Sequence, residues 1–185
     1  MNIPVLFCHA RSNYKKVPGF DVYDLERDAL NYTGSSPAIF HPPCRLWSRL
    51  KGLSTAPVYE KYFALASIDY VRSFGGIVEH PYDSALWKEV GVLKVGVKDK
   101  FGGFFIVIDQ FNFGYYTRKR TGLYIVGCEY KDIPQYDLRF ELSSRKFSNL
   151  TTKQRSESTI DFILWLKKII LIINEQKKHE KICKG

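Results

Sequence analysis

Two stretches decide the fold: PAIFHPPC at residues 37–44 and GGIVEHP at residues 75–81. Each begins as a short apolar run typical of a buried strand, and each ends at prolines that cannot continue a strand. Between them, apolar side chains recur at three- and four-residue intervals over Ala56–Phe74, as they do in an amphipathic helix that a Gly-Gly turn ends. Strand, helix and strand in this order predict a βαβ unit with a parallel sheet.

Further apolar runs extend the sheet outward from this unit. They lie at Ile3–Cys8, Phe20–Asp24, Phe104–Asp109 and Leu123–Cys128. Only about a dozen residues separate the first two runs, too few for a full helical crossover, so any crossover there is minimal. An aromatic and basic segment joins the last two runs, which favours a hairpin. Apolar periodicity over Lys153–Lys178 predicts a long C-terminal helix.

These elements predict an α/β fold. We expect a compact, Rossmann-like three-layer domain with a mainly parallel sheet and a C-terminal helix, as a single domain over residues 1–185. Residues 131–150 lack clear periodicity and are expected to form loops with at most one strand. Residues 179–185 are expected to form a flexible basic tail. In such a sheet, functional groups gather at the carboxyl ends of the parallel strands.

The charge balance favours a partner that carries phosphate. The chain holds 28 Lys and Arg residues against 19 Asp and Glu, a net charge of +9, and 15% of its residues are aromatic. Basic and aromatic side chains together suit a nucleic acid or a nucleotide. A surface rich in solvated lysine gives the same composition, and both interpretations stay open at this point.

Metal and membrane sites are not expected. The four cysteines are scattered, with no CxxC pair and no histidine at ligand spacing, so no metal is predicted. The N-terminal residues do not resemble a secretory signal, and the apolar stretch Phe162–Ile173 is too short to cross a bilayer. We expect a cytoplasmic protein without a membrane partner.

Cys44 is the first candidate for chemistry. It follows a strand and two prolines that rigidify its loop, and the neighbouring Arg45 and Arg49 favour the thiolate. The alternative is that Cys44 is a small buried apolar residue, as lone cysteines often are. Its position at a strand end favours a nucleophile.

Glu79 and His80 form the second candidate group, at the end of the next strand. Partial burial of Glu79 would raise its pKa and suit it to donating a proton. His80 is either a second functional group or a loop histidine with satisfied hydrogen bonds. Further along the chain, Arg118 and Arg120 follow several aromatic residues, a combination that suits stacking on bases and neutralising phosphate. A solvated hairpin tip has the same sequence pattern.

Three motifs taken in order give a resemblance: HPPCRLWS, IVEHP and FGYYTRKRTGLYIVG. The set resembles a shortened DNA cytosine-C5 methyltransferase, and is most similar to the small, divergent members encoded by phages and prophages. In that family a Pro-Pro-Cys loop presents the nucleophile, a glutamate contacts the N3 edge of the pyrimidine, and an arginine motif helps to hold the base. The resemblance implies Cys44 as nucleophile and Glu79 as proton donor. The expected substrate-binding residues are Arg45, Ser48, His80, Arg118 and Arg120.

The resemblance also raises the question of S-adenosylmethionine. The family cradles this cofactor in a glycine turn after the first strand, and PVLFCHARSN at residues 4–13 contains no glycine. Asp24 stands where the family places the acid that binds the cofactor ribose, as a weak cofactor-binding candidate. S-adenosylmethionine and another electrophile therefore both stay possible.

Two classes of function follow. In the first, the Cys44 thiolate adds to C6 of a pyrimidine while Glu79 assists at N3, and C5 then attacks an electrophile. In the second, the chain is a non-catalytic nucleotide- or nucleic-acid-binding protein on a degenerate methyltransferase scaffold, such as a phage counter-defence or regulatory protein. A third possibility is a pocket that binds a DNA end or a protein partner.

Overall fold

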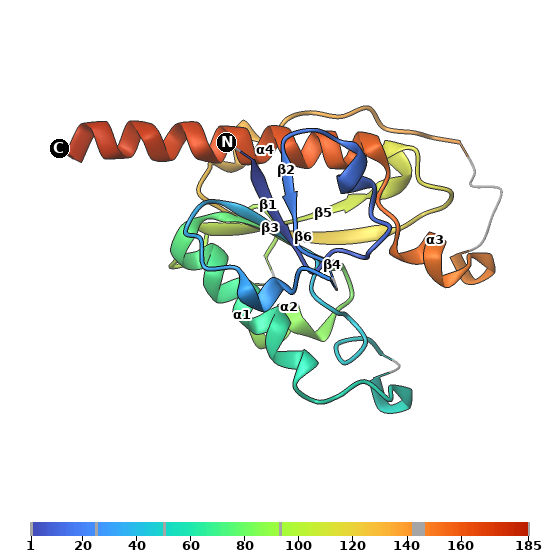
Figure 1. Cartoon of the computed structure of the whole chain (residues 1–185). Helices are drawn as coiled ribbons and strands as arrows, with labels where there is room; N and C mark the ends of the chain where they lie inside the picture. Colours follow the sequence, from blue (N-terminus) through green and yellow to red (C-terminus); the bar gives the residue numbers. More distant parts are fainter. Residues whose placement is uncertain (1, 25, 50, 93, 142–146, 185) are drawn as a thin grey trace.

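The sheet of this protein has six strands in the order β2-β1-β3-β4-β6-β5 (Figure 1). The computed structural model describes the chain except residues 1, 25, 50, 93, 142–146 and 185. The strands are β1 (Ile3–Leu6), β2 (Phe20–Val22), β3 (Ala38–Phe40), β4 (Gly76–Pro81), β5 (Gly103–Asp109) and β6 (Arg120–Val126). Each predicted strand is present, and its bounds differ from the prediction by a few residues.

The sheet is mixed. Strand β1 pairs in parallel with β2 and with β3, and β3 pairs in parallel with β4. Strands β5 and β6 form the predicted antiparallel hairpin, and β6 pairs antiparallel with β4. Strand β6 therefore lies between β4 and β5, so the hairpin joins the sheet through its second strand. The α/β class is confirmed.

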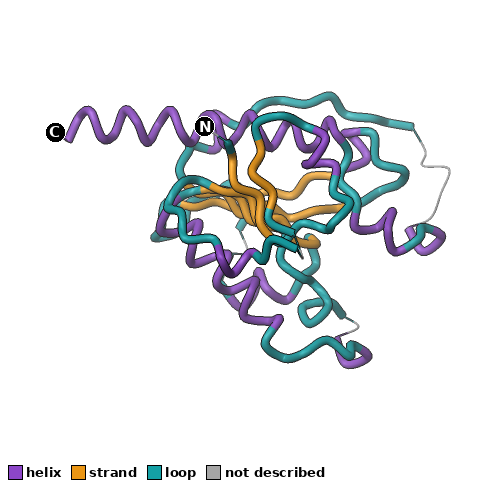
Figure 2. The backbone as a smooth tube through the Cα atoms, viewed as in Figure 1, coloured by secondary structure: helices purple, strands orange, loops and turns teal. Residues whose placement is uncertain are grey.

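Helices cover both faces of the sheet. They are α1 (Glu60–Phe74), α2 (Ala85–Glu89), α3 (Thr152–Ser156) and α4 (Ile160–Lys184). Figures 1 and 2 show α4 running along one face of the sheet and α1 with α2 on the other. Apolar residues of the strands alternate between these layers: Ile77 packs in the core beneath α4, and Val78 packs in the core beneath α1. The result is three layers.

The predicted βαβ unit is confirmed as β3, α1 and β4. Helix α1 ends at a glycine pair in which both residues have positive φ, 75° at Gly75 and 132° at Gly76. A Cβ on Gly76 would lie 2.2 Å from the carbonyl oxygen of Ala38 on the paired strand. Glycine is required there because the two backbones approach closely while the chain reverses direction. The short first crossover, between β1 and β2, holds only a 3₁₀ turn at Asn13–Lys16.

The C-terminal region differs from the prediction of one helix over residues 153–178. The region divides into α3 and α4 because the backbone of Glu157 leaves helical geometry, with ψ at 142°. After this break, the hydroxyl of Thr159 donates a hydrogen bond of 2.6 Å to the carbonyl of Phe113. Helix α4 continues to Lys184, so residues 179–184 of the expected flexible tail are helical.

The region of residues 131–150 contains no strand among the residues that are described there, in agreement with the loop prediction. Across the described part of the chain, no helix combines the length and the apolar character that crossing a membrane requires.

Candidate active site

The Pro-Pro-Cys loop leaves the sheet at the carboxyl end of β3. The backbone N–H of His41 still donates to the Leu6 carbonyl of the neighbouring strand, at 3.0 Å, and two prolines then carry the chain to Cys44. A turn closes after it, because the N–H of Trp47 donates to the Cys44 carbonyl at 3.0 Å. Cys44 therefore lies beyond the strand ends, at the edge where functional groups were expected.

Glu79 belongs to a polar network on the α4 side of the sheet. Its Oε2 lies 3.1 Å from Nδ1 of His41, whose Nε2 lies 3.0 Å from the hydroxyl of Tyr14. Its Oε1 accepts a hydrogen bond of 3.1 Å from Nε2 of Gln110, which also donates to Thr121 at 2.9 Å. Both carboxylate oxygens are thus held in place, and the side chain is only 15% exposed.

The pKa of Glu79 corrects an expectation from the sequence. Burial alone raises the pKa of this carboxyl, as expected, but the hydrogen bond and charge of His41 and the charge of Lys119 outweigh it. The pKa therefore lies below its ordinary value. Glu79 is an ionised hydrogen-bond acceptor near neutral pH rather than a proton donor.

Lys119 completes this side of the site. Its Nζ donates to the carbonyl of Glu157 at 3.1 Å and lies 4.7 Å from the centroid of the Tyr115 ring. Burial lowers the pKa of the Lys119 ammonium, while the negative charges of Glu79 and Cys44 oppose this shift. Lys119 is the cation that interacts electrostatically with both candidate catalytic residues.

The thiol of Cys44 is not activated as expected. Burial, followed by the charge of Glu79, raises its pKa, and the opposing charges of Lys119 and Arg45 do not compensate. The neighbouring arginines are engaged elsewhere: Arg45 forms an ion pair with Glu60, and Arg49 lies 3.5 Å from Asp83. Arg45 lowers the pKa of the thiol, as predicted, but too little to offset burial and the charge of Glu79.

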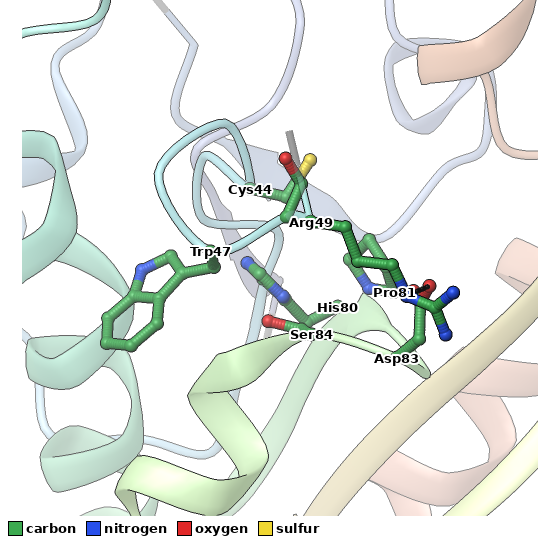
Figure 3. Close-up of a pocket in the computed structure, with 8 residues that line it drawn as sticks. Cys44, Trp47, Arg49, His80, Pro81, Asp83 and Ser84 are labelled. Atoms are coloured by element: carbon green, nitrogen blue, oxygen red, sulfur yellow. Dashed lines mark ion pairs between the residues drawn. The ribbon is translucent and has the colours of Figure 1, made fainter. Parts of the chain in front are cut away.

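A cavity of about 350 Å³ lies on the other side of the Pro-Pro-Cys loop (Figure 3). It is lined by Cys44, Trp47, Ser48, Arg49, His80, Pro81, Asp83 and Ser84. Glu79 is not among the lining residues, because neighbouring residues of β4 face opposite sides of the sheet. The structure thus brings Cys44, Ser48 and His80 together at the cavity, while Glu79, on the other face of β4, is still close enough to raise the pKa of the Cys44 thiol. In Figure 3 the sulfur of Cys44 points away from the His80 ring.

His80 is buried in the wall of this cavity. It is 1% exposed, both ring nitrogens have almost no accessible surface, and the carbonyl of Pro43 interacts with the ring. Its ring packs edge-to-face against Trp87, with centroids 6.0 Å apart. Burial lowers the pKa of His80 to about 4, although the charge of Glu79 and the Pro43 carbonyl favour protonation. The imidazole is neutral at pH 7.

Arg118 and Arg120 lie at the same edge of the sheet, where β6 begins. Arg118 pairs with Asp109 at 3.3 Å and lies over the ring of Phe111 at 4.9 Å. Arg120 lies over the ring of Tyr82 at 3.8 Å. Both side chains are exposed.

Neither Asp24 nor the turn after β1, the two places where S-adenosylmethionine could bind according to the sequence, fits this cofactor. Asp24 Oδ1 accepts the backbone N–H groups of Glu26 and Arg27, at 3.0 and 3.1 Å, and Oδ2 pairs with Lys15. Both oxygens are therefore engaged within the chain and do not offer a free pair to a ribose. The turn after β1 carries Phe7 at φ 60°, stacked on Phe63, where a cofactor loop would need glycine.

Sequence reasoning missed Lys119, Gln110 and His41. A usable signal was the period-two alternation of β6: Leu123 and Ile125 face α4, so Thr121 and Lys119 share that face with Glu79. The residues predicted from the sequence were instead Arg118 and Arg120, on either side of Lys119.

Comparisons of the chain with models of known families, with curated proteins and with solved structures give no match. The assignment of a function therefore rests on the geometry and chemistry of this edge of the sheet.

Proposed function

We propose that this chain is a pyrimidine-base modifying enzyme that resembles DNA cytosine-C5 methyltransferases, with Cys44 as its nucleophile. One observation carries the proposal. The thiol of Cys44 interacts electrostatically with both Glu79 and Lys119, at the carboxyl ends of adjacent parallel strands. The three-layer mixed sheet is compatible with a Rossmann-like, methyltransferase-like domain, and its expected partner is a nucleotide or nucleic acid in the cytoplasm.

The chemistry begins at the thiol. Sulfur bonds to C6 of the pyrimidine, the C5=C6 double bond opens, and the electron pair moves onto C5. Because Glu79 is ionised, it accepts a hydrogen bond from an amino group or a protonated N3 at the base edge. The thiol releases its proton to water, and the ammonium of Lys119 compensates the negative charge that forms on the sulfur. This compensation matters because burial makes the thiolate of Cys44 costly.

The addition of the Cys44 thiol to C6 can be detected without a second substrate. C5 takes a proton from water, and reversal of the addition then removes either hydrogen from C5 as sulfur leaves C6. Repeated addition and reversal exchange the hydrogen at C5 with solvent. The residues at β1 and β2 do not fit S-adenosylmethionine, and this exchange requires no electrophile other than the proton.

Hydrogen exchange at C5 tests the proposal. A single-stranded oligonucleotide with deuterium at C5 of its cytosines is incubated with the protein, and mass spectrometry follows the loss of deuterium. We expect loss with the native protein and a rate at least about 100-fold lower with Cys44→Ala. Cys128→Ala is the matched control, since Cys128 is buried in the core beneath α4. Equal rates with and without Cys44 would show that this thiol is not the nucleophile.

A second candidate is a nucleotide- or nucleic-acid-binding protein without catalysis. The raised pKa of the Cys44 thiol favours it, because a protonated thiol is a poor nucleophile. In that case Cys44→Ala binds the oligonucleotide as tightly as the native protein, and neither protein exchanges deuterium.

A further inference from the structure

Helix α4 presents an exposed stripe on the side that faces away from the core. This outer stripe consists of Asp161, Leu164, Lys168, Leu171, Glu175 and Lys178. Its residues follow one another at intervals of three and four, which is the spacing of the contact positions in a coiled coil. On the other side of the same helix, Leu166, Ile169 and Ile173 are buried in the core beneath α4. Helix α4 therefore packs on the sheet with one face and presents a regular second face to solvent.

We propose that the outer stripe is the interface of an antiparallel dimer, in which α4 of a second copy of this chain lies along it. The two-fold axis of this dimer passes beside Leu171, near the middle of the stripe. The dimer is independent of the function proposed above, because the stripe faces away from the sheet and includes no residue of the candidate active site.

The charges of the outer stripe complement one another in an antiparallel pair but not in a parallel one. Lys168 precedes Leu171 by three residues, and Glu175 follows it by four. Two antiparallel copies centred on Leu171 therefore place Lys168 of each copy opposite Glu175 of the other. A parallel pair would place lysine opposite lysine and glutamate opposite glutamate. Neither side chain forms an ion pair within the part of the chain that the structure describes, so both are available to a second copy.

The same arrangement covers the apolar side chains that α4 exposes. Leu171 is 48% exposed and Leu164 is 40% exposed. In the antiparallel pair, Leu171 packs against Leu171 of the second copy. Leu164, seven residues before the axis, lies opposite Lys178, seven residues after it. The aliphatic stem of this lysine covers the leucine while its ammonium stays in water.

The end of α4 supplies a second, independent reason for a partner. Nε2 of Gln176 donates to Asp132 at 2.6 Å, and Nζ of Lys177 donates to the carbonyl of Phe74. Beyond these contacts the helix continues to Lys184 and extends past the other elements of the fold (Figure 1). A helical end of this length gains no tertiary packing there, and short unpacked helices are marginal in water. The antiparallel dimer places this end along the start of α4 in the second copy.

Sedimentation velocity of the native protein tests the dimer. At an ionic strength of about 0.15 M the Debye length is about 8 Å, so repulsion between two copies of net charge +9 is largely screened. We expect a shift from monomer to dimer as the protein concentration rises. Leu171→Glu should lower the association constant at least about 100-fold, because it places two carboxylates face to face at the axis. Leu53→Glu is the matched control and should have no effect, since Leu53 is 82% exposed but lies in the 3₁₀ turn Lys51–Leu53 rather than on α4.

Charge reversal tests the antiparallel orientation. Lys168→Glu alone and Glu175→Lys alone should each lower the association constant at least about tenfold, because each variant puts like charges opposite one another. The combined variant Lys168→Glu with Glu175→Lys restores opposite charges at both positions and should associate as the native protein does. An equimolar mixture of the two single variants should form a heterodimer, since one copy then presents glutamates where the other presents lysines. Circular dichroism checks that each variant keeps its helix content.

Three results would overturn the proposal. The first is a native protein that stays monomeric up to about 1 mM, a concentration at which even a weak dimer is populated; the outer stripe would then face solvent or a different protein. The second is equal weakening by Leu171→Glu and Leu53→Glu, which would place the interface outside α4. The third is a combined variant that does not recover association, which would exclude the pairing of Lys168 with Glu175 of the second copy.

Discussion

His80 shows how burial fixes the charge of a single residue. Its ring is buried in the wall of a cavity, and this burial lowers its pKa from 6.5 to about 4. The unfolded chain therefore binds a proton between these two pH values that the folded chain does not bind. Because the unfolded state holds more protons there, the stability contributed by the neutral ring is present at pH 7 and is lost as the pH falls through this window.

The lowered pKa of His80 predicts that the stability of the folded protein depends on pH. The free energy of unfolding of the native protein should fall by about 2 kcal/mol more between pH 7 and pH 5 than that of His80→Leu, which cannot titrate. Urea denaturation at the two pH values measures the difference. Parallel losses in the two proteins would mean that His80 is protonated in the folded state.

The charges of Cys44 and Glu79 show where residue-level prediction fails. The sequence places each at a strand end, and the structure confirms these positions. It does not reveal that His41 and Lys119 hold Glu79 ionised, or that burial and Glu79 together raise the pKa of Cys44. Those shifts depend on groups far apart in the chain, such as His41 and Glu79, which only the folded sheet brings within 3.1 Å.

At the scale of elements, the turn that carries Gly76 is the tightest point of the βαβ unit. Gly76→Ala would place a Cβ 2.2 Å from a backbone oxygen at a φ of 132°. We expect a loss of at least about 2 kcal/mol in the free energy of unfolding, measured by urea denaturation. The matched control is Gly91→Ala: φ there is also positive, at 72°, but nothing lies within 4 Å of the added Cβ. Equal losses in the two variants would assign the effect to backbone strain alone.

The sequence predicts the individual helices and strands better than it predicts which strands pair with one another. Apolar periodicity and the Gly-Gly turn are local signals, so the βαβ unit and the β5–β6 hairpin were predicted. The insertion of β6 beside β4 was not predicted, because strand pairing is decided by packing between distant residues. For the same reason Lys119 was missed: its role depends on β6 lying against the strand that carries Glu79.

At the scale of the whole molecule, exposed arginines gather at the carboxyl edge of the sheet. Arg120 begins β6 at the edge where β4 ends, Arg118 lies just before it, and Arg49 lines the cavity. The rings of Phe111 and Tyr82 lie beneath the guanidinium groups of Arg118 and Arg120. Cations above aromatic rings suit a flexible single strand, whose bases can stack while its phosphates are neutralised.

This arrangement predicts a salt-dependent affinity for single-stranded DNA. Each phosphate that a cation neutralises adds about 0.7 to the slope of log K against log salt concentration, so the combined variant Arg118→Gln and Arg120→Gln should reduce the slope by roughly 1.4. Fluorescence anisotropy with a labelled oligonucleotide at several salt concentrations measures it. The control variant combines Lys98→Gln and Lys100→Gln. These two lysines precede β5 near the opposite edge of the sheet, so their loss should leave the slope unchanged. If both pairs reduce the slope equally, the DNA responds to the net charge of +9 rather than to this edge, because only a local interface distinguishes two pairs of equal charge.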